Sequence, residues 1–129
     1  MLVYCVDVRS LSEKNTESVL ALVNTCFEAR ISRLDYSYGV ICQDRGDVLG
    51  VALVSVQQNE HEIQRLCVDR SRRGAGLGTE ILSVVKEQLN SLPAAMTLPS
   101  ACARREDVRV FFQTNGFVNL PGDRMRFSP

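Results

Sequence analysis

Residues 68–79 read Val68-Asp69-Arg70-Ser71-Arg72-Arg73-Gly74-Ala75-Gly76-Leu77-Gly78-Thr79. This glycine loop lies between an apolar, β-rich stretch, 62–68, and a stretch with helical periodicity, 78–89. Glycines at the start of a helix let a ligand's phosphates approach unpaired backbone amides, because no Cβ atoms stand in the way, and the helix dipole adds roughly half a positive charge. Arg70, Arg72 and Arg73 add formal charge close by. We therefore expect the loop to bind a phosphorylated small molecule.

Two common nucleotide-binding loops do not fit this sequence. A P-loop needs Gly-Lys-Ser/Thr, whose lysine reaches the terminal phosphates, but here Thr79 and Glu80 follow Gly78. The dinucleotide fingerprint is Gly-x-Gly-x-x-Gly after the first strand of a parallel unit, whereas this loop has Gly-x-Gly-x-Gly after a predicted fourth strand. One alternative stays open, in which the glycines form only a tight turn and the arginines are solvated.

Upstream of the loop, the pattern predicts four strands and one helix. The predicted strands cover residues 2–8, 36–42, 48–57 and 62–68. Apolar residues at helical spacing predict a helix over 16–29, with Asn15 or Thr16 as its N-cap. Residues 48–57 are apolar on both parities, as in a central strand covered on two faces. The apolar parity changes within 62–68, which predicts a bulge near residues 64–66.

Downstream of the loop, the pattern predicts two helices and three strands. The helices cover 78–89 and 106–114, and the strands cover 94–98, 117–120 and 124–127. The expected fold is a single α/β domain over residues 1–129. It has mixed α+β character, with a central, mostly antiparallel mixed sheet of about six to seven strands and flanking helices.

Composition limits the classes of partner. The chain has 129 residues, of which 45% are apolar and 23% charged, so one globular domain is expected rather than a disordered or fibrous chain. Fifteen basic residues balance fifteen acidic ones. The molecule as a whole therefore has no electrostatic attraction to nucleic acid or to an anionic membrane, and neither is expected as a partner.

The cysteines and the first residues of the chain give an expectation for the cellular compartment of the protein. An odd number of cysteines without a Cys-x-x-Cys pair predicts buried thiols in a reducing compartment rather than a disulfide framework. They are Cys5, Cys26, Cys42, Cys67 and Cys102. Asp7 and Arg9 interrupt the start of the chain, unlike a signal peptide, and no stretch approaches the roughly 20 apolar residues of a membrane span. The expected location is cytoplasmic or nuclear.

Three segments resemble the GNAT superfamily of N-acetyltransferases. Arg73–Gly78 match the family's Arg/Gln-x-x-Gly-x-Gly/Ala motif, which binds the pyrophosphate of acetyl-CoA. Glu62 and Ile63 stand where many of these enzymes carry Glu-Ile, and residues 111–117, FFQTNGF, are similar to their closing motif Phe-Tyr-x-x-x-Gly-Phe. The similarity covers about residues 48–117, and the predicted element order follows the family throughout. The resemblance implies a single GNAT-like domain with acetyl-CoA as co-substrate and no metal.

The resemblance also implies which residues hold the cofactor. The amide of Val68 is expected to bond the acetyl carbonyl, the backbone at Leu66 to pair with the pantetheine arm, and the amides of Arg73–Thr79 to hold the pyrophosphate. Arg70 or Arg72 is expected to reach the 3'-phosphate. The full set of expected cofactor-binding residues is Leu66, Cys67, Val68, Arg73, Gly74, Ala75, Gly76, Leu77, Gly78, Thr79 and Phe112.

The reaction implied is attack of a neutral amine on the acetyl thioester. Deprotonating a lysine-like amine near pH 7 costs about 4–5 kcal/mol, so a nearby carboxylate or water relay is useful. By resemblance, Glu62 corresponds to the general base of several family members, and with Val68 it makes up the expected catalytic pair. The alternative is that Glu62 is a solvated strand carboxylate. His61, the single histidine, is expected at the surface and pointing the other way.

One position departs from the family pattern. Many members carry a tyrosine in the closing helix that protonates the leaving thiolate, and Phe112 stands at that position here. A thiolate leaves tolerably well without an acid, so activity is compatible with this change. Ser100, Cys102, Tyr36 and Tyr38 are the candidates to replace the tyrosine.

The expected function is acetyl-CoA-dependent N-acetylation of a primary amine, on a protein, a peptide, a small amine or a polyamine, by direct attack on the thioester. We expect acceptor choice to lie in the loop 30–38 and the turn 121–123, with Asp35, Glu60 and Glu62 attracting a cationic amine. Two alternatives stay open: a non-catalytic acyl-CoA-binding or sensing module, which the missing tyrosine permits, and a plain interaction domain. The sequence also leaves open whether the protein is a monomer or a homodimer.

Overall fold

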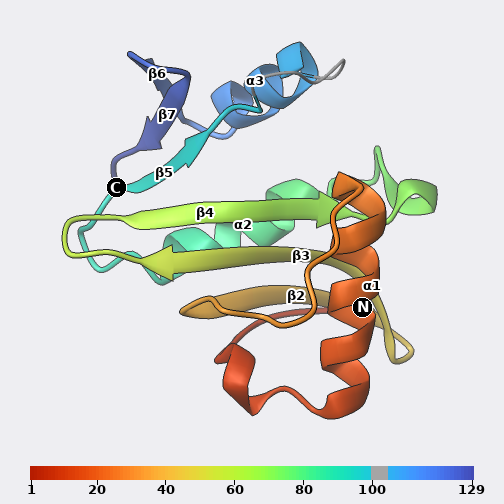
Figure 1. The fold of residues 1–129 in the computed structure, drawn as a ribbon. Helices are drawn as coiled ribbons and strands as arrows, with labels where there is room; N and C mark the ends of the chain where they lie inside the picture. Colours follow the sequence, from red (N-terminus) through yellow and green to blue (C-terminus); the bar gives the residue numbers. More distant parts are fainter. Residues whose placement is uncertain (100–104) are drawn as a thin grey trace.

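The computed structural model describes residues 1–99 and 105–129, which form seven strands, three α-helices and two short 3-10 helices (Figure 1). In chain order the elements are β1 (Leu2–Val6), η1 (Val8–Ser10), α1 (Glu13–Phe27), β2 (Tyr38–Asp44), β3 (Asp47–Val56), β4 (His61–Val68), η2 (Arg70–Arg72), α2 (Leu77–Glu87), β5 (Ala94–Thr97), α3 (Arg105–Thr114), β6 (Val118–Leu120) and β7 (Arg124–Phe127). Apart from the two 3-10 helices, this is the order that the sequence predicts.

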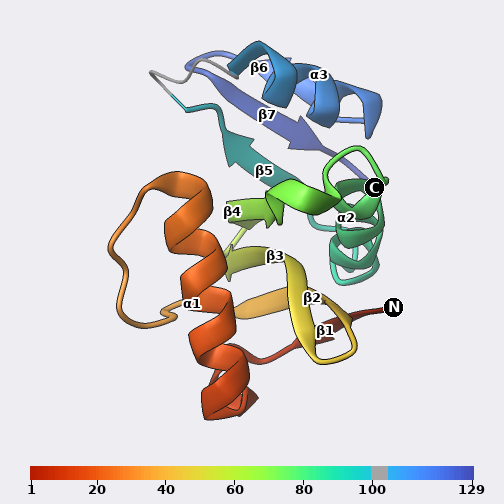
Figure 2. The same cartoon turned by 90° about the vertical axis from the view of Figure 1, so that its right-hand side faces the viewer.

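The strands form one sheet in the order β1-β2-β3-β4-β5-β7-β6. Neighbouring strands are antiparallel except β4 and β5, which are parallel. Figure 2 shows α1 and α2 on opposite faces of this sheet. The predicted single α/β domain with a mostly antiparallel mixed sheet is confirmed. Within the described part of the chain, no helix is both long and apolar enough to cross a membrane.

Two hydrophobic cores cover the two faces of the sheet. The larger core lies beneath α2 and α3 and includes the fully buried Ile81, Leu82 and Met125. The smaller core lies beneath α1 and includes the fully buried Val19 and Val23. Since β3 supplies side chains to both cores, its sequence is apolar on both parities.

α1 begins and ends earlier than the predicted helix 16–29. Ser12 has extended backbone dihedrals, and its hydroxyl accepts a hydrogen bond from the Asn15 amide at 3.1 Å. Ser12 is therefore the N-cap, and the prediction of Asn15 or Thr16 in that role is wrong. The helix ends at Phe27 because Glu28 adopts a left-handed conformation, with φ of 50°.

β4 carries a bulge where the sequence parity changes. Leu53 of β3 pairs with Arg65 and Val54 pairs with Ile63, so Gln64 is the extra residue. The predicted bulge near residues 64–66 is confirmed. As a result Ile63 and Cys67, which have the same parity in the sequence, lie in opposite cores.

β4 and β5 pair over a short distance and then diverge. The register joins His61 to Ala94 and Glu62 to Ala95, although β4 continues to Val68. Figure 1 shows the two strands separating toward the C-terminal end of β4. Within residues 1–99 and 105–129, no strand pairs with this edge of β4 beyond Glu62, so its backbone groups are available to a ligand.

The cysteines are not uniformly buried. Cys42 and Cys67 are buried as predicted, Cys26 is half-buried, and Cys5 is exposed. The prediction is wrong for Cys5 because β1 is an edge strand of the sheet. Cys102 lies outside the described residues.

Replacing Ile81 by Ala is expected to lower the free energy of unfolding by about 2–5 kcal/mol, because a fully buried side chain is replaced by a cavity. Urea denaturation followed by circular dichroism measures the change. The control is Val110→Ala on α3, where the side chain is 51% exposed and the effect should stay below about 0.5 kcal/mol. Equal effects at the two positions would contradict the assignment of α2 to the core.

Candidate active site

A cleft of about 510 Å³ opens beside the diverging end of β4. Five parts of the chain line it: the end of β4, the glycine loop with the start of α2, Pro99 after β5, α3, and the last turn of α1. The lining residues are Cys26, Phe27, Leu66, Cys67, Val68, Arg72, Arg73, Gly74, Gly76, Leu77, Gly78, Thr79, Pro99, Asp107, Val108, Phe111 and Phe112. Segments far apart in the sequence thus meet at one concave surface.

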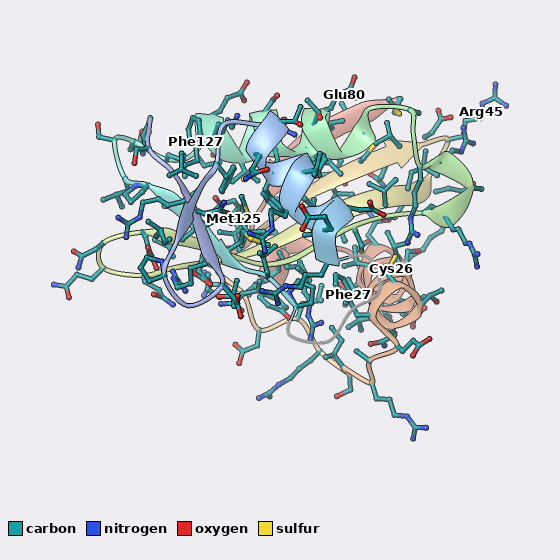
Figure 3. All side chains as sticks on the ribbon, turned by 90° about the horizontal axis from the view of Figure 1, so that it is seen from above. Cys26, Phe27, Arg45, Glu80, Met125 and Phe127 are labelled. Carbon is teal, nitrogen blue, oxygen red and sulfur yellow. The ribbon has the colours of Figure 1, made fainter. Side chains whose placement is uncertain are left out.

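The cleft collects nearly all of the residues predicted to hold the cofactor. Of that set, only Ala75 is absent from the lining. The sequence prediction missed Cys26 and Phe27, which Figure 3 shows at the end of α1. Nothing in the helical pattern of α1 marks these two residues, because their position depends on how α1 packs against β4.

The glycines of the loop meet different structural needs. Gly74 and Gly76 have positive φ values of 86° and 81°, a conformation that other residues adopt at a cost. A Cβ at either position would have no atom within 4 Å, so the requirement there is conformational. A Cβ at Gly78 would lie 2.9 Å from Cζ of Phe111, so this glycine lets α3 pack against α2.

The N-terminus of α2 presents backbone amides to the cleft. Gly76 is the N-cap and has no side chain to cap the helix, and the Glu80 amide donates to the Gly76 carbonyl at 3.1 Å. The amides of Leu77–Thr79 precede this first helical hydrogen bond and belong to residues that line the cleft. Arg72 and Arg73 line it as well. This end of the cleft is therefore suited to an anion.

Hydrogen bonds fix the loop between β4 and α2. The Asp69 carboxylate accepts hydrogen bonds from the Ser71 amide at 2.9 Å and the Ser71 hydroxyl at 2.7 Å, and these bonds lower the pKa of Asp69. Nε of Arg73 donates to the Val68 carbonyl at 3.3 Å. The loop is thus tied to the end of β4 before any ligand binds.

Glu62 does not line the cleft, and it is not solvated. The residue is 8% exposed and lies where β4 and β5 begin to diverge. Nη1 and Nη2 of Arg124 donate to its Oε1 and Oε2 at 3.3 and 3.0 Å, and Nη2 also donates to Glu60 at 2.7 Å. The alternative of a solvated strand carboxylate is therefore wrong. Hydrogen bonding to Glu62 is the main cause that raises the pKa of Arg124.

His61 is buried, so the predicted surface position is wrong. It is 6% exposed, and its Nδ1 lies 2.9 Å from the hydroxyl oxygen of Tyr38. β4 has neighbours on both sides at this point, since His61 pairs with Val56 of β3 and Ala94 of β5. Burial lowers the pKa of His61 and raises the pKa of Tyr38.

Two of the four candidates for a general acid can be placed relative to the cleft. Tyr36 and Tyr38 are not among its lining residues, and Ser100 and Cys102 lie outside the described part of the chain. Phe112 is 3% exposed and makes edge-to-face contacts with two other phenylalanine rings. It lines the cleft and anchors α3 to the core at once.

The sequence of residues 8–128 matches the acetyltransferase (GNAT) domain family. This match covers most of the chain, so the protein belongs to the GNAT acetyltransferase family. Its class is therefore that of the acyl-CoA-dependent acyltransferases. No curated protein sequence matches the chain.

Solved structures share this fold over their full length. An acyl-CoA N-acyltransferase from Pseudomonas aeruginosa has a TM-score of 0.80 at 15% identity, covering 98% of this chain and 99% of that one. ElaA from Escherichia coli has a TM-score of 0.80 at 15% identity, covering 99% and 100%. The PaiA N-acetyltransferase from Thermoplasma acidophilum, solved in complex with coenzyme A, has a TM-score of 0.72 at 13% identity, covering 100% of both chains. At these identities the likeness establishes the fold.

Burial of His61 predicts a pH dependence of stability. A histidine in an unfolded chain has a pKa of about 6.5, and the pKa of His61 in the folded protein is lower. As the pH falls, the unfolded chain therefore binds a proton at a higher pH than the folded chain does. The contribution of His61 to stability is complete above the unfolded pKa and falls as the pH drops toward the folded pKa, by at most about 1.4 kcal/mol per pH unit. Urea denaturation at pH 7.5 and at pH 5.5, the latter about one unit below the unfolded pKa, measures this loss.

The control is His61→Gln, which keeps a hydrogen-bonding group for Tyr38 but does not titrate. The wild type should lose more stability between the two pH values than this variant does. An equal loss in both proteins would show that His61 binds its proton as easily in the folded state.

Proposed function

We propose that the protein is an acetyl-CoA-dependent N-acetyltransferase that moves an acetyl group to a primary amine by direct attack on the thioester. One observation carries the proposal: the residues at the start of α2, together with Arg72 and Arg73, line the same cleft as the free edge of β4. Coenzyme A has a diphosphate, which needs an anion-binding site, and an extended pantetheine arm with amides, which needs a free strand edge beside that site. The complex of PaiA, which has the same fold, with coenzyme A supports this choice of cofactor.

The cleft divides into a polar end and an apolar wall. At the polar end the amides of Leu77–Thr79 and the two arginines would hold the pyrophosphate. Along the β4 edge, the backbone of Leu66 and Val68 would pair with the pantetheine amides as an added strand does. Val108 and Phe111 of α3 supply apolar contact from the opposite wall.

Glu62 is the proposed general base, acting through a water molecule. It lies at the apex of the divergence but outside the lining of the cleft, so a relay suits its position better than direct contact with the amine. Arg124 occupies two of about four lone-pair positions on the carboxylate, which leaves others to accept a proton. Val68 is the proposed amide donor to the acetyl carbonyl, where negative charge develops during attack.

A second function, binding of acyl-CoA without catalysis, is favoured by two observations. Phe112 offers no hydroxyl where many family members have a tyrosine, and Glu62 is ion-paired with Arg124. A sensing module would bind coenzyme A through the same glycine loop and would have no acceptor amine. The acceptor panel below separates this alternative from the enzyme.

Two measurements test the proposed function. Titration calorimetry with coenzyme A tests the cofactor, and thiol release from acetyl-CoA in the presence of lysine peptides, free N-terminal peptides, polyamines and small amines tests the reaction. Saturable thiol release with one class of amine supports the enzyme. Binding of coenzyme A without release for any amine supports the sensing module, and absence of binding contradicts both.

The variant Gly76→Ala is expected to weaken coenzyme A binding by about tenfold or more, because a non-glycine residue at positive φ shifts the N-terminal amides of α2. Gly46→Ala is the matched control. Gly46 has a similar φ of 86° and open space around its Cβ position, but lies in the β2–β3 hairpin away from the cleft. Both variants should lose similar stability, while affinity measured by calorimetry should fall in Gly76→Ala alone. Equal affinities would exclude the loop as the pyrophosphate site.

Replacing Glu62 by Gln should reduce kcat by about 10²–10⁴-fold and shift the pH–rate profile, because the amide cannot accept a proton. The profile of kcat/KM between pH 6 and 9 with the best amine measures this effect. Glu60→Gln is the control, since Glu60 shares the contact with Arg124 but lies before β4 begins. A profile unchanged in the Glu62 variant would remove this residue from the mechanism.

A further inference from the structure

Two thiols lie together in the wall of the cleft, and the proposed reaction uses neither of them. Cys26 belongs to the last turn of α1, and Cys67 belongs to β4. Both line the cleft, and Cys26 packs against the core cluster that contains Cys67. Sγ of Cys26 lies 3.8 Å from the carbonyl oxygen of Val68, the neighbour of Cys67. The bulge in β4 turns the Cys67 side chain to the face of the sheet that α1 covers, which brings it to the same side as Cys26.

The two thiols differ in access and in electrostatic environment. Cys26 is half-buried and lines a second cavity of about 580 Å³ as well as the cleft, and Nη2 of Arg73 lies 4.0 Å from its Sγ. Cys67 is 6% exposed, and burial, followed by the charge of Cys26 and a hydrogen bond to it, raises the pKa of its thiol. Cys26 is thus placed to react first and Cys67 to react second.

We propose that Cys26 and Cys67 form a redox-active pair that takes small-molecule disulfides as its oxidant. The Cys26 thiolate attacks one sulfur of the disulfide, whose S–S bond breaks and releases one thiol, which carries the proton lost by Cys26. Cys67 then loses its proton and attacks Sγ of Cys26, which releases the second thiol and closes the Cys26–Cys67 disulfide. Two electrons pass from the protein dithiol to the small molecule, which is reduced to two thiols.

The surrounding structure favours formation of the Cys26–Cys67 disulfide. The guanidinium carbon of Arg65 lies 4.9 Å from the centroid of the Phe27 ring, which holds the last turn of α1 over β4. α1 ends at Phe27, and residues 28–37 contain no helix or strand. The final helical turn can therefore adjust to the Cβ separation of about 3.8 Å that a disulfide needs without moving the rest of α1.

The disulfide would alter the cleft itself. It would join α1 to β4 and remove the thiol that Arg73 contacts. The consequence for the cofactor rests on the proposed function: oxidation should weaken coenzyme A binding, and reduction should restore it. Formation of the disulfide is independent of that function, because no coenzyme A takes part in it.

The test uses the full chain carrying Cys5→Ser and Cys102→Ser, which leaves Cys26, Cys67 and the buried Cys42 as an internal control. The protein is incubated with oxidised glutathione, alkylated in urea so that buried free thiols also react, and digested, and its peptides are identified by mass spectrometry. We expect a Cys26–Cys67 cross-linked peptide, loss of two of the three thiols, reversal by dithiothreitol, and an alkylated Cys42. Adding Cys67→Ser should stop the reaction at a mixed disulfide of glutathione with Cys26.

Two results would overturn the proposal. One is Cys26 that remains alkylatable after oxidation, and the other is a stable Cys26–glutathione adduct while Cys67 stays free. The cross-link is mapped in the chain with both cysteines present, so the outcome does not depend on whether the Cys67→Ser variant folds. If the cross-link forms and coenzyme A does not bind to the reduced protein, the redox pair stands and the proposed function fails.

Discussion

The divergence of β4 from β5 beyond Glu62 is the constraint on which the cleft depends. A strand inside a sheet normally pairs on both edges, but within the described residues one edge of β4 has no partner strand from Ile63 to Val68. Pairing with β3 and burial of Ile63 and Cys67 in opposite cores, on the two sides of the bulge at Gln64, hold this part of β4 in place. The glycine loop starts where β4 ends, and residues at the start of α2 line the cleft beside the free edge of β4.

Polar groups around this opening are held by other protein groups before a ligand arrives. The loop is fixed by Asp69 and by the bond from Arg73 to Val68, and Glu62 is held by Arg124 from β7. Preorganised amides and carboxylates of this kind need little rearrangement during a reaction. The same arrangement places a half-buried thiol, Cys26, near the Arg73 guanidinium in the wall of the cleft. The proposed acyl transfer and the proposed oxidation of Cys26 and Cys67 would therefore influence each other.

Local patterns predicted the strands, the glycine loop and the bulge, because each depends on residues close in sequence. Parity within 62–68 indicated the bulge, and glycines before a helical pattern indicated a loop suited to an anion. The features that the sequence pattern did not predict depend on contacts between residues far apart in the sequence. His61 is buried by neighbouring strands on both sides and by Tyr38, Arg124 reaches Glu62 from 62 positions away in the sequence, and the last turn of α1 enters the cleft through packing alone.

Backbone amide NMR shifts on addition of coenzyme A test the central claim most directly, because each amide reports on its own surroundings. The account predicts the largest shifts at residues 66–68 and 73–79, where the open edge of β4 meets the start of α2. Smaller shifts should appear at the last turn of α1. Shifts centred elsewhere, for example on β1 and the β2–β3 hairpin, or no shifts at saturating coenzyme A, would contradict it.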